Sequence, residues 1–131
     1  MIAVDANVLV RLLVNDDAAQ AGRARSLFDS LADQHGAIWI ADVVLVESVW
    51  VLDRAYGRSR EDIALAVRAL LGNATLSLES ALCAEQALPL FERGPADFAD
   101  CLLCVKAQAA GCQGVRSFDR RMRTLPGVDP L

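Results

Sequence analysis

The residues best suited to chemistry in this sequence are four acids that stand where a predicted strand ends or the following helix begins: Asp5, Glu47, Asp100 and Asp119. Asp5 and Asp119 follow short apolar runs, Asp100 lies in the first turn of a predicted helix, and Glu47 lies one turn inside another. Because the carboxyl ends of parallel strands meet at one edge of a sheet, these side chains are expected to converge there.

Glu47 gives the strongest indication of a metal. It is flanked by apolar residues on both sides, from Val43 to Leu52, and no face of this predicted helix is obviously exposed. A carboxylate buried there would cost several kcal/mol unless a cation or hydrogen-bond donors compensated it. The one lysine, Lys106, lies far along the chain, so a divalent cation is the simplest explanation. Ligands that are all oxygen favour Mg²⁺ or Mn²⁺ over zinc.

Several of these acids also have an ordinary structural role open to them. Asp5 could cap the helix that begins at Ala6, and Asp119 could cap the turn that follows it. Asp97 and Asp100 share one helical face, and their spacing also matches a helix cap followed by an acidic residue in the first turn. For Asp97 alone, capping is the preferred interpretation.

Other catalytic chemistries find little support. The chain has one histidine, His35, and no Gly-x-Ser-x-Gly turn, so hydrolysis by a Ser-His-Asp triad is disfavoured. Cys101 and Cys104 could be half of a zinc or redox site, but they lie in an apolar helical pattern without a second pair. We therefore expect buried, reduced thiols.

The elements that would position the acids alternate along the chain. Apolar runs at residues 2–4 and 37–41 predict strands, as do the short segments 75–78 and 115–118, with a further edge strand near residue 128. Pairs of helical patterns separate the first four. Asp16 or Asp17, and Ser59 with Asp62, are typical helix starts. This order predicts one α/β domain over residues 1–131: three α/β/α layers around a central, mostly parallel sheet of four to five strands.

Composition restricts the partners. The net charge is −4, which excludes a general basic coat for nucleic acid. Residues 101–131 nevertheless carry five basic side chains against two acidic ones, or +3. The longest uncharged stretch has ten residues, at 69–78, too short for a membrane span, and the N-terminal residues lack the pattern of an export signal. A cytoplasmic protein without membrane contact is expected.

Four sequence blocks carry a family resemblance: residues 5–11 (DANVLVR), 44–52 (VLVESVWVL), 97–103 (DFADCLL) and 117–121 (SFDRR). In this order and context they are similar to those of PIN-domain ribonucleases, and within that group to the VapC toxins of bacterial toxin–antitoxin pairs. The family usually has Ala and Ile where Cys101 and Leu103 stand, and often Thr where Ser117 stands. These replacements preserve size or the hydroxyl group.

The resemblance implies a PIN-like domain and a Mg²⁺-dependent endoribonuclease, with Mn²⁺ as a possible substitute. The family's catalytic acids fall on Asp5, Glu47, Asp100 and Asp119, and Asp97 is an auxiliary acid. Asp5 and Asp100 are expected to bind the metal directly, and Asp97 and Asp119 are also assigned to the metal site. The matching polar positions, Asn7 and Ser117, would orient these carboxylates.

The same resemblance implies partners. Arg116, Arg120 and Arg121 flank the last acid and are expected to bind RNA phosphates. A homodimer and a VapB-like antitoxin that blocks the acidic groove are also implied. Apolar helix residues near Leu12, Leu13, Val49 and Leu52 are candidate contact surfaces.

Two other classes of acidic α/β protein fit less well. A receiver-like phosphoacceptor generally has a Lys after a late strand, where this chain has only Arg. A phosphatase of the haloacid dehalogenase type needs Asp-x-Asp after the first strand, where this chain has Asp5-Ala6-Asn7. A PIN fold or receiver-like Mg²⁺-binding module without nuclease activity remains the alternative to the nuclease.

Overall fold

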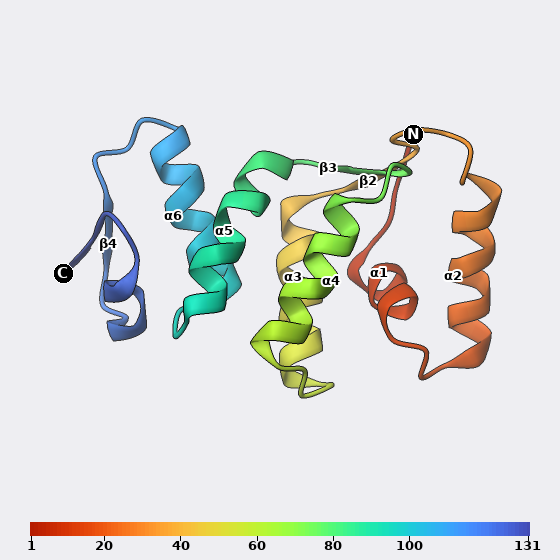
Figure 1. The fold of residues 1–131 in the computed structure, drawn as a ribbon, viewed down its shortest axis with the longest axis horizontal. Helices are drawn as coiled ribbons and strands as arrows, with labels where there is room; N and C mark the ends of the chain where they lie inside the picture. The colour runs from red at the N-terminus through yellow and green to blue at the C-terminus, as the bar shows by residue number, and fades with distance from the viewer. The chain divides into compact units, whose positions relative to one another are not determined.

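The computed structural model describes residues 1–131, which form two compact units (Figure 1). The first unit comprises Met1–Ala81 and the second Leu82–Leu131. No helix in either unit is long and apolar enough to cross a membrane.

The first unit is built on a parallel sheet with the strand order β1-β2-β3. The strands are β1 (Ile2–Ala3), β2 (Ile38–Ile40) and β3 (Leu76–Leu78), and Ile38 is in register with both Ile2 and Leu76. Two helices follow each of the first two strands: α1 (Ala6–Leu13), α2 (Ala18–Ser30), α3 (Asp42–Arg54) and α4 (Arg60–Leu71). Parallel neighbours need such crossovers, so the sheet places the ends of β1 and β2 at one edge.

Side-chain caps start three of these helices. The carboxylates of Asp5 and Asp17 accept hydrogen bonds from the backbone N–H groups of Val8 and Gln20, and the Ser59 hydroxyl accepts one from Asp62. Each bond satisfies an amide that the helix itself leaves without a partner. The caps predicted from the sequence are therefore confirmed, with Asp17 rather than Asp16 at the start of α2.

Asp16 instead joins a polar network around Arg11. The Arg11 guanidinium pairs with Asp16 and donates to the Gln20 carboxamide at 2.8 Å and to the Tyr56 hydroxyl at 2.9 Å. The Tyr56 hydroxyl in turn donates to Asp16 at 2.6 Å. This network connects α1 and the start of α2 to the turn that follows α3.

The second unit contains α5 (Ala81–Arg93), α6 (Phe98–Ala109), strands β4 (Val115–Ser117) and β5 (Val128–Pro130), and the 3₁₀ turn η1 (Arg120–Thr124). β4 and β5 pair in parallel, with Val115 opposite Val128. Phe91 at the end of α5 packs edge-on against Phe98 at the start of α6, with ring centroids 5.8 Å apart. This contact fixes the first turn of α6, where two of the candidate acids lie.

The α/β class and its parallel strands are confirmed. All five predicted strands are present, and hydrogen bonding divides them into the three-stranded sheet β1-β2-β3 and the two-stranded sheet β4-β5. Apolar runs identify strands but not their partners, so this division was not evident from the sequence. Cys101 and Cys104 are buried free thiols, as predicted.

The core of the first unit makes the packing testable. Leu9 on α1 is fully buried, whereas Leu65 on α4 is 59% exposed. We expect Leu9→Ala to lower the free energy of unfolding by about 3 kcal/mol, because it removes buried apolar surface and leaves a cavity. The matched control Leu65→Ala should change it by less than about 0.5 kcal/mol. Urea denaturation of both variants measures the difference, and equal losses would contradict the assigned core.

Candidate functional site

Asp5 lies directly after β1, where it caps α1 through a 3.1 Å hydrogen bond from the Val8 amide to its Oδ1. Its side chain is exposed and lines a pocket of about 430 Å³ in the first unit. A cap uses one carboxylate oxygen as acceptor and leaves lone pairs on both. The structural and chemical roles that the sequence left open for Asp5 are therefore compatible.

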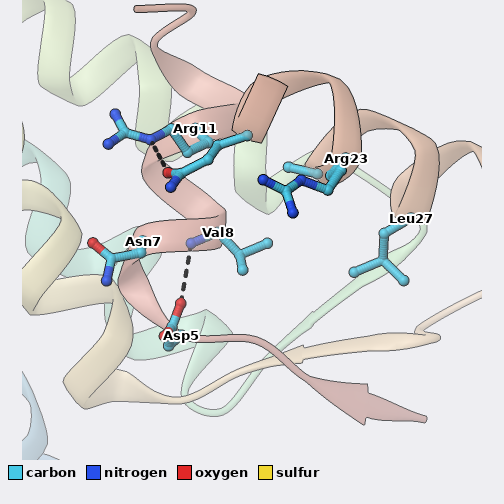
Figure 2. Close-up of a pocket in the computed structure, with 8 residues that line it drawn as sticks. Asp5, Asn7, Val8, Arg11, Arg23 and Leu27 are labelled. Atoms are coloured by element: carbon cyan, nitrogen blue, oxygen red, sulfur yellow. Dashed lines mark hydrogen bonds between the residues drawn. The ribbon is translucent and has the colours of Figure 1, made fainter. Parts of the chain in front are cut away.

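The pocket beside Asp5 lies between α1 and α2 (Figure 2). Val8 and Arg11 from α1 and Arg23 and Leu27 from α2 line it, together with Asn7, Gln20 and Ala24. Arg23 is exposed, so this pocket combines an apolar wall with a solvated positive charge. Sequence reasoning missed Arg23, because only the packing of α1 on α2 brings it near Asp5.

Glu47 is exposed on α3, so the argument that predicted a metal from its burial is wrong. The core face of α3 is formed by Leu45, Ser48, Val49 and Leu52, while Val43 and Trp50 are 75% and 60% exposed. Because apolar residues occupy both faces of this helix, the sequence pattern could not show which face points to solvent. Val49 and Leu52 belong to the buried face, so they are not available as contact residues for a partner protein.

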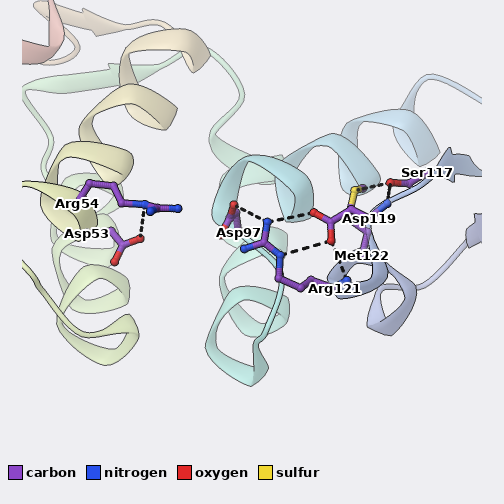
Figure 3. Close-up of polar contacts among 7 residues, drawn as sticks. All are labelled: Asp53, Arg54, Asp97, Ser117, Asp119, Arg121 and Met122. Carbon is purple, nitrogen blue, oxygen red and sulfur yellow. Dashed lines mark hydrogen bonds and ion pairs between the residues drawn. The ribbon is translucent and has the colours of Figure 1, made fainter.

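Three of the predicted acids come together in the second unit. Asp97 and Asp119 lie on either side of Arg121 (Figure 3), and the charges of both act on Asp100. Asp97 occupies the cap position of α6 but makes no capping hydrogen bond with its side chain, contrary to the preferred interpretation. Its carboxylate instead lies 3.6 Å from the Arg121 guanidinium, which is 3.1 Å from Asp119. Asp119 also caps η1 by accepting a 2.8 Å hydrogen bond from the Arg121 amide.

Electrostatics divide these acids. Partial burial raises the pKa of Asp100 above its ordinary value, and the nearby carboxylates of Asp97 and Asp119 raise it further. The side-chain hydrogen bond from Arg121 lowers the pKa of Asp119. The surroundings thus destabilise the ionised form of Asp100 and stabilise the ionised form of Asp119.

Ser117 at the end of β4 supports the position of Asp119. Its hydroxyl oxygen accepts a 2.9 Å hydrogen bond from the Asp119 amide and lies 3.3 Å from the Met122 sulfur (Figure 3). Met122 is buried, so the hydroxyl ties the turn to the core of the second unit. This geometry holds the Asp119 backbone, and through it the start of η1.

The predicted RNA-binding arginines lie in different surroundings. Arg116 pairs with Asp129 on the neighbouring strand at 2.9 Å, and Arg121 pairs with acids of the cluster. Arg120 is exposed. Much of the positive charge that the sequence places near Asp119 is therefore matched by carboxylates of the same unit.

The predicted site residues are thus distributed over both units. Asp5, Asn7 and Glu47 belong to the first, and Asp97, Asp100, Ser117 and Asp119 to the second. No group of three or more His, Cys, Asp or Glu side chains has the arrangement of a formed metal site. All the candidate donors are carboxylate oxygens, the type that Mg²⁺ and Mn²⁺ prefer.

Comparison with known proteins identifies the family. A PIN-domain family model matches residues 2–128, a span that includes both units and every candidate acid. The chain belongs to the PIN-domain family. Its resemblance to VapC-type PIN proteins is also confirmed: it is 28% identical to a VapC ribonuclease of Aquifex aeolicus (strain VF5) over 125 residues, 95% of this chain and 92% of the relative.

A solved structure is similar along nearly the whole length of this PIN-domain chain. It is the crystal structure of VapC20 from Mycobacterium tuberculosis, described as a sarcin-ricin loop cleaving toxin. The identity is 21%, the TM-score is 0.46, and the match covers 98% of this chain and 97% of that one.

The raised pKa of Asp100 predicts a cost in stability. Because this pKa is higher in the folded than in the unfolded chain, folding becomes less favourable as the pH rises through the interval between the two values. We expect Asp100→Asn to raise Tm at pH 7, since the amide removes the repulsion from Asp97 and Asp119. The gain should shrink as the pH is lowered and wild-type Asp100 takes up its proton.

Thermal melts of the wild type and the variant between pH 7 and pH 4 test this expectation. Glu85→Gln, at an exposed position on α5, is the matched control and should show no such pH-dependent gain. A lower Tm for Asp100→Asn at pH 7 would contradict the assigned repulsion.

Proposed function

We propose that this PIN-domain protein is a metal-dependent endoribonuclease toxin that hydrolyses RNA phosphodiester bonds and is neutralised by a VapB-like antitoxin. The observation that carries the proposal is the cluster of Asp97, Asp100 and Asp119, in which burial and like charge raise the pKa of Asp100. A site that brings carboxylates together at such a cost is typical of functional positions. The similarity to the VapC ribonuclease supports the nature of the reaction.

The residues present suit Mg²⁺ or Mn²⁺. A divalent cation would relieve the repulsion that Asp97 and Asp119 exert on Asp100, and it would find only hard oxygen ligands. The proposed metal ligands are Asp5, Asp97, Asp100 and Asp119. The proposed catalytic acids are Asp5, Glu47, Asp100 and Asp119. When bound, the cation supplies an activated water and neutralises charge on the phosphate.

The chain's own residues would hold these carboxylates in position. The Asp5 carboxylate is fixed by its bond to the Val8 amide, and the start of η1 by the bond from the Asp119 amide to Ser117. The Asp5 carboxylate retains lone pairs for another partner, because its cap uses only Oδ1. Asn7 and Ser117 are proposed to orient the carboxylates, as the resemblance implies.

RNA recognition is proposed to use arginines on both units. Arg120 is exposed, and Arg23 beside Asp5 offers a second solvated guanidinium. Arg116 and Arg121 would first have to leave their carboxylate partners. Arginine suits this role because its planar donors match phosphate oxygens. The homodimer, the antitoxin and the cytoplasmic location are proposed from the similarity to VapC.

Cleavage of total cellular RNA by the purified protein, freed of any copurifying partner, tests the proposal. We expect discrete fragments with Mg²⁺ and none with EDTA. Asp5→Asn and Asp100→Asn should each reduce the rate at least about 100-fold, because each removes a charged ligand. Asn also caps helices well, so Asp5→Asn should keep α1 intact.

The exposed Glu85→Gln variant should cleave like the wild type. Metal binding without any cleavage would favour the acidic metal-binding module over the nuclease. Full activity in Asp100→Asn would contradict the assigned site.

The pocket between α1 and α2 gives a separate prediction for RNA binding. Arg23 lines this pocket, whereas Arg25 is exposed on the same helix outside it. In an Asp100→Asn background that prevents cleavage, Arg23→Ala should weaken binding of single-stranded RNA several-fold. It should also reduce the steepness of the fall in log affinity with log salt concentration by about 0.7, the value for one phosphate contact on a single strand.

Fluorescence anisotropy between 50 and 200 mM salt measures both quantities. Arg25→Ala is the matched control, since it removes the same charge from the same helix. Identical losses for the two variants would mean that Arg23 contributes only general charge.

A further inference from the structure

Arg121 is the cation at the centre of the acidic cluster. Its Nη2 atom lies 3.1 Å from Oδ2 of Asp119 and 3.6 Å from Oδ2 of Asp97, so one nitrogen bridges two carboxylates (Figure 3). Its Nε donates to Oδ1 of Asp119 at 3.4 Å. The two acids come from the start of α6 and the start of η1, which are 22 residues apart in the sequence.

The guanidinium contacts oxygens of both carboxylates. Both oxygens of Asp119 accept hydrogen bonds from the Arg121 side chain, and Oδ1 also accepts from its backbone amide. A divalent cation bound to the same oxygens would compete for their lone pairs and would repel the guanidinium. Arginine stays protonated at any physiological pH, so it can give way only by moving.

Its surroundings allow that movement. The Arg121 side chain is 49% exposed, and ion pairs with this degree of exposure are weak. The cap of η1 is made by the backbone amide and not by the guanidinium, so the turn keeps its hydrogen bond when the side chain swings away. Attraction to the charge of Arg121 also offsets part of the rise in the pKa of Asp100 that burial, Asp97 and Asp119 cause.

We infer that Arg121 is an exchangeable counter-cation: its guanidinium holds Asp97 and Asp119 together in the metal-free protein, and a divalent cation must displace it to use these carboxylates. This inference rests on the proposed function, because that function requires the metal. Arg121 is thus a positioning residue for the acids. It sets the affinity for metal by competing with it.

Binding of Mn²⁺ to the intact protein without RNA tests the inference, measured by isothermal titration calorimetry. Arg121→Gln should bind Mn²⁺ about fivefold more tightly than the wild type, the factor that corresponds to losing one exposed ion pair at the upper end of the usual range, about 1 kcal/mol. Arg120→Gln removes an equal charge from the adjacent exposed position and is the matched control; its affinity should change much less. Equal or weaker binding by Arg121→Gln would overturn the inference.

A second variant separates charge from folding. Arg121→Lys keeps the positive charge but loses the planar donors, so its Mn²⁺ affinity should lie between those of the wild type and Arg121→Gln. Circular dichroism checks that each variant is folded, and if Arg121→Gln is not, the Lys variant decides: affinity no greater than that of the wild type would overturn the inference. Mn²⁺ binding by the wild type without tighter binding by the variants would overturn the role of Arg121 and leave the proposed function intact. No binding by any of them would overturn both.

Discussion

Repulsion among carboxylates is the constraint on which this structure depends. Asp97, Asp100 and Asp119 share one region of the second unit, and partial burial together with the charges of Asp97 and Asp119 raises the pKa of Asp100. Arg121 offsets part of this repulsion by pairing with Asp97 and Asp119. A chain selected for stability alone would gain by neutralising one of these acids, so their proximity points to a use of the charge itself.

Two of the acids are held in place by their positions at the start of a helix or turn. Asp5 and Asp119 each cap a helix or turn with one oxygen, and the positive end of a helix stabilises the charge. A cap fixes the backbone and the side-chain direction together while leaving other lone pairs available. Structural and chemical roles are therefore not alternatives at these two positions, although the sequence presents them as such.

Apolar packing in the second unit and a polar network in the first fix the elements that carry the acids. The Phe91–Phe98 contact fixes the first turn of α6, and the buried Met122 anchors η1 beneath Ser117. In the first unit, the network of Arg11, Asp16 and Tyr56 connects the helices beside Asp5. Polar groups with several partners of this kind resist reorientation, which suits residues that must present a carboxylate in a defined direction.

The parallel α/β class, the order of strands and helices and most helix caps follow from the sequence, because apolar periodicity and capping residues are local signals. The family follows from the resemblance of the four sequence blocks around the acids. The sequence could not decide the exposure of Glu47, since α3 has apolar residues on both faces and only packing selects the buried one. Nor could it decide that Asp97 pairs with Arg121 instead of capping α6, or that Arg23 lines the same pocket as Asp5. These relations join residues distant in sequence, so they exist only once the helices pack, and tertiary structure alone decides them.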